Sequence, residues 1–197
     1  PEDQLEVKYP GIVQGNTGAL SFLDIARYTQ SGTGQGELIG YASFTTEQFS
    51  FPYGAHFCEV AVNMRTGNID ILKYYALQDC GTPVNPDLAL GQIYGGVLKT
   101  IGHSLYEQMQ FDKRGVCLNP NLKDYGVPMI TDLPKDFQAK MIFTDDPYGP
   151  YGAKSVSEIS CNGAAPALFA AIHDAAGVWI RSWPFTPEKI LRELKTL

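Results

Sequence analysis

Alternation of apolar and polar residues predicts a β-hairpin in the first half of the chain. Residues 57–64 and 68–77 both alternate, with Val60 and Val62 on one side of the first run. The two runs are joined at residues 65–67, which include a glycine. A period of two residues places the apolar side chains of each strand on one face. The sequence therefore predicts a hairpin with one buried face.

Other segments are also predicted to be extended. Residues 38–46 and 137–143 are expected to be strands. Residues 109–117 are expected to form a second hairpin that turns near Asp112 to Gly115. Residues 119–134 are predicted to be mostly loop.

The longest predicted helix begins at Asn85-Pro86-Asp87 and continues to about residue 108. These residues supply an N-cap, a proline at the first helical position and an acid in the first turn. At helical spacing, the core face is formed by Leu90, Ile93 or Tyr94, Val97, Ile101 and Leu105. A second face holds Gln92, Gly95, Gly96, Lys99 and His103. A glycine in a helix interior costs about 1 kcal/mol relative to alanine, so we expect another backbone or a cofactor to pack against this face.

Three shorter helices complete the prediction. They cover residues 21–28, residues 166–176 and residues 186–194. Gly177 is expected to terminate the second of these helices. Strands and helices are interspersed without a repeating βαβ pattern, which favours an α+β fold with a mixed β-sheet and packed helices. Residues 1–17 are polar and interrupted by proline and glycine, and are interpreted as a connecting arm before a domain of residues 18–197.

Composition and charge exclude several classes of partner. The 197 residues carry a net charge of −6, which argues against nucleic acid and anionic membranes as partners. No apolar run approaches the roughly 20 residues of a membrane span, and no signal peptide is visible, so a cytoplasmic protein is expected. The four cysteines are far apart, so the spacing predicts neither a zinc nor an iron–sulfur site in this chain. Because the first residue is Pro1, we expect a processed or excised piece of a longer protein.

The candidate chemistry lies at Glu158. Residues 145–150 hold two prolines and a glycine and predict a tight loop, and a segment rich in glycine, serine and alanine then carries Glu158 into a helix. Small residues let a backbone approach a bulky ligand closely. The alternative is that Glu158 only stabilises the helix dipole. His56 is interpreted as structural. The glycine run of residues 32–36 is interpreted as a loop, and the alternative is that it belongs to a nucleotide-binding module.

Four motifs resemble the molybdenum hydroxylases, the xanthine dehydrogenase and aldehyde oxidase family. Gly152-Ala-Lys-Ser-Val-Ser-Glu158 is similar to the Gly-Ala-Lys-x-Val-Gly-Glu segment of that family. The other motifs are Phe51-Pro-Tyr-Gly-Ala-His-Phe-Cys-Glu-Val60, Asp79-Cys-Gly-Thr-Pro-Val-Asn-Pro-Asp87 and Gly91-Gln-Ile-Tyr-Gly-Gly96. The resemblance runs from about Ser21 to the end and corresponds to the C-terminal part of the molybdopterin-binding subunit.

The resemblance implies a function and a site. The expected enzyme hydroxylates an N-heterocycle such as a purine, or an aldehyde, with water as the oxygen source and Glu158 as the general base. Val156 and Ile159 are expected to give Glu158 a semi-buried pocket. The Val156-Ser157 backbone, Gly95, Gly96 and Lys99 are expected to contact a molybdenum-pyranopterin, or its cytosine dinucleotide form, and the chain itself supplies no metal ligand.

The resemblance also implies partners. These are the remaining molybdopterin-binding portion, subunits that carry iron–sulfur clusters and FAD, and a small-molecule substrate. The isolated chain is therefore expected to be inactive.

Two positions depart from the family pattern. Ser157 stands where the family commonly has glycine, and Lys99-Thr100 stands where it commonly has Gln-Gly. These departures keep open an alternative, a non-catalytic or assembly subunit that retains the fold.

Overall fold

The computed structural model describes residues 5–8, 11–15, 18–31, 36, 39–43, 45–46 and 48–195. The chain divides into two compact units, one within residues 1–45 and the other within residues 46–197.

The first unit is a small antiparallel sheet followed by a helix. Strands β1 (Glu6–Lys8), β2 (Ile12–Gly15) and β3 (Gly18–Ser21) pair in the order β1-β2-β3. Helix α1 (Phe22–Gln30) begins directly after β3, and the Ser21 hydroxyl accepts a hydrogen bond from a backbone N–H of its first turn at 3.1 Å. The helix predicted at residues 21–28, with Ser21 as its N-cap, is confirmed.

Two further expectations concern residues 1–46. The expected connecting arm of residues 1–17 contains β1 and β2 within its described part. The division of the chain into an arm and a domain stays a prediction. The strand predicted at residues 38–46 was wrong, because residues 39–43 and 45–46 form no strand. A strand needs a hydrogen-bonded neighbour, and the described residues offer this segment none. Of the glycine run at residues 32–36, only Gly36 is described.

The second unit is built on a mixed three-stranded sheet. Strands β4 (Tyr53–Val62) and β5 (Ile69–Asp79) pair antiparallel, which confirms the predicted hairpin. Strand β6 (Asp136–Ile142) pairs parallel to β5 on its other side, so the strand order is β4-β5-β6. The predicted mixed sheet of an α+β fold is therefore confirmed, and β5 is its central strand.

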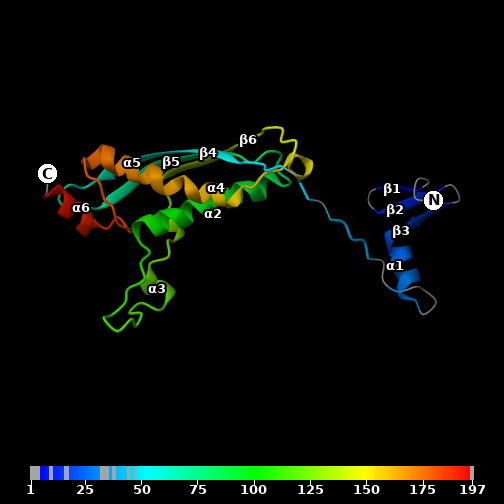
Figure 1. The fold of residues 1–197 in the computed structure, drawn as a ribbon, viewed down its shortest axis with the longest axis horizontal. Helices are drawn as coiled ribbons and strands as arrows, with labels where there is room; N and C mark the ends of the chain where they lie inside the picture. The colour runs from blue at the N-terminus through cyan, green and yellow to red at the C-terminus, as the bar shows by residue number, and fades with distance from the viewer. Residues whose placement is uncertain are drawn as a thin grey trace. The chain divides into compact units, whose positions relative to one another are not determined.

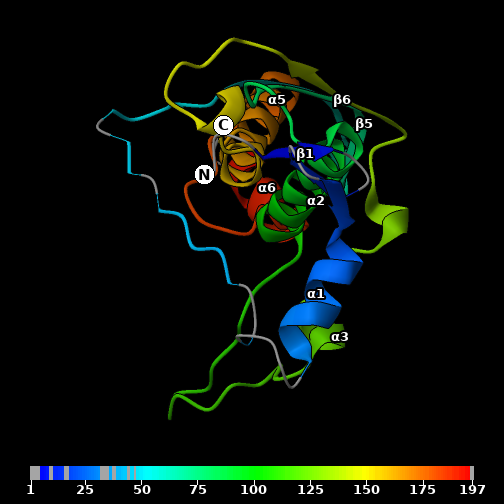
Figure 2. The ribbon, with the colours of Figure 1, turned by 90° about the vertical axis from the view of Figure 1, so that its right-hand side faces the viewer.

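Three helices cover one face of this sheet (Figures 1 and 2). They are α2 (Pro86–Leu105), α4 (Ser157–Asn162) and α5 (Ala164–Ala176). The Asn85 side chain caps α2 by accepting a hydrogen bond from a first-turn N–H at 3.0 Å, as predicted. The core lies between these helices and the sheet, and its fully buried side chains include Tyr74, Ile93, Val97, Ile101, Leu168 and Ile172.

The remaining helices follow their predicted signals. Gly177 ends α5 in the left-handed conformation, with a φ of 71°. Helix α6 (Pro187–Leu194) begins after Thr186, whose hydroxyl caps it. No helix among the described residues is both long enough and apolar enough to cross a membrane.

Residues 106–129 form a projecting loop that leaves the body of the second unit (Figures 1 and 2). It contains one short helix, α3 (Leu122–Tyr125), and is followed by the 3₁₀ turn η2 (Ile130–Asp132). The hairpin predicted at residues 109–117 is reduced to one bridge between Phe111 and Cys117, although the chain turns at residues 112–115 as predicted. Asn119 fixes the loop from within, because its buried amide bonds the backbone at Gln110 and Gln108.

Candidate functional site

Glu158 lies in the first turn of α4, and its side chain is exposed. The expected pocket around it is not formed by its neighbours. Val156 packs against the core, and Ile159 lies against Gly54 of β4, where a Cβ would stand 3.2 Å from the Ile159 side chain. Residues two before and one after a helical position do not share its face, so both side chains turn inward while Glu158 turns outward.

The segment that leads to Glu158 makes a left-handed turn. Tyr151 has a φ of 55° and Gly152 a φ of 80°. This turn directs the Gly152 carbonyl to the Thr82 N–H, at 2.7 Å. A Cβ on Gly81 would lie 2.1 Å from the same carbonyl oxygen. Only glycine at position 81 allows this approach of the two backbones.

A fully buried glutamine at the end of β5 holds the start of α4. With its amide oriented to satisfy both groups, Gln78 donates to the Val156 carbonyl at 3.2 Å and accepts from the Ser160 N–H at 2.9 Å. These two bonds lie on either side of Ser157 and Glu158 in the sequence. The central strand of the sheet therefore fixes the backbone that carries Glu158.

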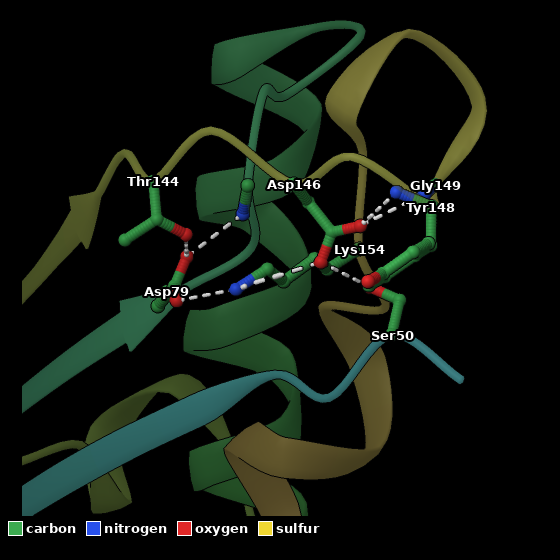
Figure 3. Close-up of polar contacts among 8 residues, drawn as sticks. Ser50, Asp79, Thr144, Asp146, Tyr148, Gly149 and Lys154 are labelled. Carbon is green, nitrogen blue, oxygen red and sulfur yellow. Dashed lines mark hydrogen bonds and ion pairs between the residues drawn. The ribbon is translucent and has the colours of Figure 1, made fainter. Parts of the chain in front are cut away.

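A buried lysine fixes the same segment four residues earlier (Figure 3). Lys154 Nζ donates to Asp79 Oδ2 at 2.7 Å and lies 3.9 Å from Asp146 Oδ2. The Lys154 side chain is only 7 % exposed. A buried ammonium is tolerated when it is paired and hydrogen-bonded. Lys154, Asp79, Asp146, Thr144 and Ser50 together are called the Lys154 cluster.

The two carboxylates of this cluster are fully occupied (Figure 3). Asp79 Oδ1 accepts hydrogen bonds from Thr144 Oγ1 at 2.7 Å and from the Gly81 N–H at 2.9 Å. Asp146 Oδ2 accepts from Ser50 Oγ at 2.7 Å, and Asp146 Oδ1 caps a turn through the backbone N–H groups of residues 148 and 149. The cluster thus joins β5, the segment after β6, the turn at residues 146–149 and the residues before β4.

Hydrogen bonding keeps both partners of the central pair ionised. Burial alone would raise the pKa of Asp79, but the hydrogen bonds from Lys154, Gly81 and Thr144 bring that pKa below its ordinary value. The hydrogen bond to Asp79 raises the pKa of Lys154 against the opposing effect of burial. The pair is charged at every pH between these two displaced values.

A hollow of about 410 Å³ lies beside the same segment. Its wall includes Val156, Lys154, Asn85 and Gln92, together with the exposed apolar residues Val84 and Leu88. The hollow therefore combines amide groups with apolar surface next to the backbone that leads to Glu158. Of the residues predicted to bind a cofactor, Val156 lines this hollow.

The remaining predicted residues lie on α2. Gly96 meets α4, because a Cβ there would stand 2.2 Å from Ser160 Oγ. Gly95 faces open space, and no described heavy atom lies within 4 Å of an added Cβ. Lys99 is exposed. The structure brings Gly96 to the helix that carries Ser157 and Glu158, and it explains Gly96 by the approach of α4. The cofactor roles of these five residues, Val156, Ser157, Gly95, Gly96 and Lys99, and the catalytic role of Glu158 stay predictions.

Gln78, Asp79 and Lys154 were not predicted from the sequence as functional residues. Asp79 and Lys154 lie within two of the quoted motifs, and a signal was present in the sequence. A lysine among small and apolar residues is rarely buried without a partner. Which carboxylate it meets, 75 positions away, is set by the fold and is not readable from spacing.

Comparison with known proteins defines the class of this chain. The profile of the family described as molybdopterin cofactor-binding domain matches residues 1–134. The chain is 55 % identical over its full length to the probable hypoxanthine oxidase XdhD of Escherichia coli, and it covers 21 % of that protein. It is 35 % identical over 150 residues, 75 % of the chain, to the carbon monoxide dehydrogenase large chain of Hydrogenophaga pseudoflava, and it covers 19 % of that protein.

A solved structure agrees with the sequence comparison. Quinoline 2-oxidoreductase from Pseudomonas putida matches 99 % of this chain with a TM-score of 0.76 and 27 % identity, and the match covers 26 % of that protein. The chain belongs to the molybdopterin cofactor-binding domain family, within the molybdenum hydroxylases. It spans about a fifth of the length of the curated relatives it matches, 21 % of the first one.

Proposed function

We propose that this chain is part of a molybdenum hydroxylase and that Glu158 is its general base. The expected reaction is hydroxylation of an N-heterocycle such as a purine, or of an aldehyde, with water as the oxygen source. The observation that carries the proposal is the placement of Glu158. Its carboxylate is exposed, and its backbone is fixed by Gln78 beside the hollow.

The lining of the hollow suits the ring system of a pterin. A pterin needs amide-type hydrogen-bonding partners and flat apolar contacts, and the wall offers Asn85 and Gln92 together with Val84 and Leu88. We assign these residues and the Val156-Ser157 backbone to cofactor binding, with Gly95, Gly96 and Lys99 on the adjoining helix. The bound molybdenum centre would supply two-electron redox chemistry and activation of water.

The residues of this chain orient that chemistry and accept its proton. A general base must lie within hydrogen-bond reach of the proton that it removes. Here Glu158 lies in the first turn of α4, and the hydrogen bonds from the Gln78 side chain to the backbone of Val156 and Ser160 set its position. Because the Val156 side chain packs inward, the carboxylate of Glu158 is free to meet a ligand.

The proposal includes partners that lie outside this chain. Because the chain spans a fifth of its relatives, we infer that the remaining molybdopterin-binding portion completes the site. We further propose that FAD and iron–sulfur clusters on partner subunits carry the electrons away, and that the pterin takes its plain or its cytosine dinucleotide form.

Replacement of Glu158 by glutamine in the complete enzyme tests this function. Glu158→Gln is nearly isosteric but cannot accept a proton, so turnover should fall by about 10²–10⁴-fold while molybdenum content stays at the wild-type level. Glu188 is a matched control, because it too is an exposed acid in the first turn of a helix. Glu188→Gln should leave turnover unchanged. Retention of more than about a tenth of wild-type turnover by Glu158→Gln would remove the residue from the base role.

Lys99 favours a second candidate, a subunit that keeps the fold without turnover. It carries a point charge where the family commonly has a neutral amide. If its face of α2 meets the cofactor, Lys99→Gln should preserve assembly and change cofactor retention or the reduction potential. The exposed Lys140 of β6 gives a control, Lys140→Gln. A purified wild-type assembly that holds molybdenum yet oxidises no purine, N-heterocycle or aldehyde would support this second candidate.

A further inference from the structure

The segment from Lys154 to Glu158 is held at each end by the same strand. At the start, the Lys154 side chain bonds Asp79, and its backbone N–H bonds the Cys80 carbonyl at 2.8 Å. At the other end, Gln78 bonds the Val156 carbonyl and the Ser160 N–H. Gln78, Asp79 and Cys80 are consecutive, so a short stretch at the end of β5 determines the path of this segment.

The two anchors differ in kind. The Gln78 anchor is a pair of neutral hydrogen bonds, whereas the Lys154 anchor is a buried ion pair in which both side chains are below 10 % exposed. The Lys154 ammonium also lies near Asp146, whose carboxylate accepts a hydrogen bond from the turn at residues 146–149. A single residue, Ser155, separates Lys154 from Val156 (Figure 3 shows the cluster). A displacement of Lys154 must therefore move the start of α4.

We propose that Lys154 is a positioning residue for Glu158, and that its pair with Asp79 sets where the carboxylate of Glu158 stands relative to the substrate. This inference rests on the proposed role of Glu158 as the base. The Lys154 ammonium is buried and hydrogen-bonded to Asp79, although the residue also lines the hollow, so the proposed effect on Glu158 runs through the backbone of the segment. A misplacement of about 1 Å can lower a rate by about a hundredfold.

The test uses the complete, cofactor-loaded enzyme and expresses turnover per molybdenum. Lys154→Met removes the ammonium and keeps an unbranched side chain that reaches the position of the lysine Cε. It should lower kcat per molybdenum by about tenfold or more, while KM stays within about twofold because substrate contacts are not altered. A residue that only supports folding would lower the yield of loaded enzyme and leave kcat per loaded site unchanged.

Two further variants keep the test decisive. Asp79→Asn breaks the same pair from the other side, leaves Asp146 near Lys154, and should lower kcat in the same direction by a smaller factor. It decides the question if Lys154→Met does not fold. Lys73→Met is the matched control, because it breaks the exposed ion pair of Lys73 with Glu59 on the same hairpin, 2.8 Å in length. Lys73→Met should match the wild type.

The outcomes separate this inference from the proposed function. If Glu158→Gln abolishes turnover but Asp79→Asn and Lys154→Met both keep kcat per molybdenum within about twofold of wild type, Lys154 only supports the fold and the inference fails. If Glu158→Gln itself leaves turnover intact, Glu158 is not the base, and the proposed function and the inference that rests on it both fail.

Discussion

At the scale of single residues, two adjacent glycines of α2 have opposite surroundings. Gly95 faces open space, and Gly96 lies against Ser160. Gly95→Ala should therefore raise the free energy of unfolding by about 1 kcal/mol, the usual difference between these residues in a helix. Gly96→Ala should lower it by about 1–3 kcal/mol, because the new methyl group must displace α4. Urea unfolding of the two variants measures both changes.

Gly91 supplies the control for this pair, since an added Cβ there also meets nothing within 4 Å. Gly91→Ala should match Gly95→Ala in stability. If Gly95 contacts the cofactor in the complete enzyme, Gly95→Ala should lower molybdenum content there although the chain is more stable. Equal destabilisation by alanine at positions 95 and 96 would contradict the described packing of α2 against α4.

The residues of the candidate site could be predicted only in part. Glu158, Val156 and Ser157 follow from a contiguous motif, and the structure places them together because they are consecutive. The two glycines were noticed for their cost in a helix, but their different neighbours depend on how α4 crosses α2. The contacts of Gln78 and Lys154 join segments far apart in the sequence, and no local pattern specifies them.

At the scale of elements, the junction of α4 and α5 rests on a histidine of β4. A Cβ on Gly163 would lie 2.2 Å from the His56 ring, so the glycine lets the two helices meet over it. His56 Nδ1 lies 2.8 Å from the Tyr74 hydroxyl, and its buried Nε2 has no hydrogen-bond partner among the described residues. Burial lowers the pKa of His56. A protonated imidazole therefore disfavours this arrangement of helices.

The lowered pKa of His56 determines how stability changes with pH. The unfolded chain binds a proton at His56 near pH 6.5, the ordinary value, whereas the folded chain binds it only at lower pH. The contribution of His56 to stability is therefore present above pH 6.5 and is lost as the pH falls through its lowered folded value. Urea unfolding of wild type and His56→Gln between about pH 7 and 5 should show a smaller fall in the variant. The exposed His103 gives a control, and the free energy of unfolding of His103→Gln should fall with pH as it does in wild type. A different fall in His103→Gln would mean that the pH dependence does not come from His56.

Elements with strong local signals were predicted well. The β4–β5 hairpin alternates clearly, and α2 has an N-cap, a first-turn proline and an apolar face. The strands β1 and β2 were missed because they have only three and four residues, too few to show an alternating pattern, and pairing makes them strands. The parallel pairing of β6 with β5 is not encoded in the pattern of β6 itself, because the same alternation suits either direction.

At the scale of the whole molecule, many large apolar side chains among the described residues of the second unit are exposed. Several large apolar side chains of the projecting loop and of the segment after α5 are more than 40 % exposed, among them Met109, Phe111, Leu118, Leu122, Trp179 and Trp183. Contiguous exposed apolar surface is typical of protein interfaces. We expect the isolated 197-residue chain to self-associate and to retain no molybdenum, because one helix face and one hollow supply few contacts for a large anionic cofactor.

Light scattering across a range of chain concentrations, with metal analysis of the same samples, checks this expectation. The mean mass should rise with concentration, and replacement of Leu118 and Leu122 by serine should reduce the rise. Replacement of the exposed polar residues Lys113 and Lys123 by serine is the matched control on the same loop. A chain that stays monomeric, or that purifies with bound molybdopterin, would contradict the expectation.

The position of β5 at the centre of its sheet has a consequence during synthesis. The ribosome delivers β4 and β5 together, but β6 follows only after α2 and the projecting loop have been made. Until then one edge of β5 is open to pairing with other chains. Asp79, at the end of that strand, is also synthesised before its partner Lys154. Until the two residues pair, the carboxylate of Asp79 stays hydrated. The hydrated end of β5 therefore resists burial in a premature contact until the segment that carries Glu158 has left the ribosome.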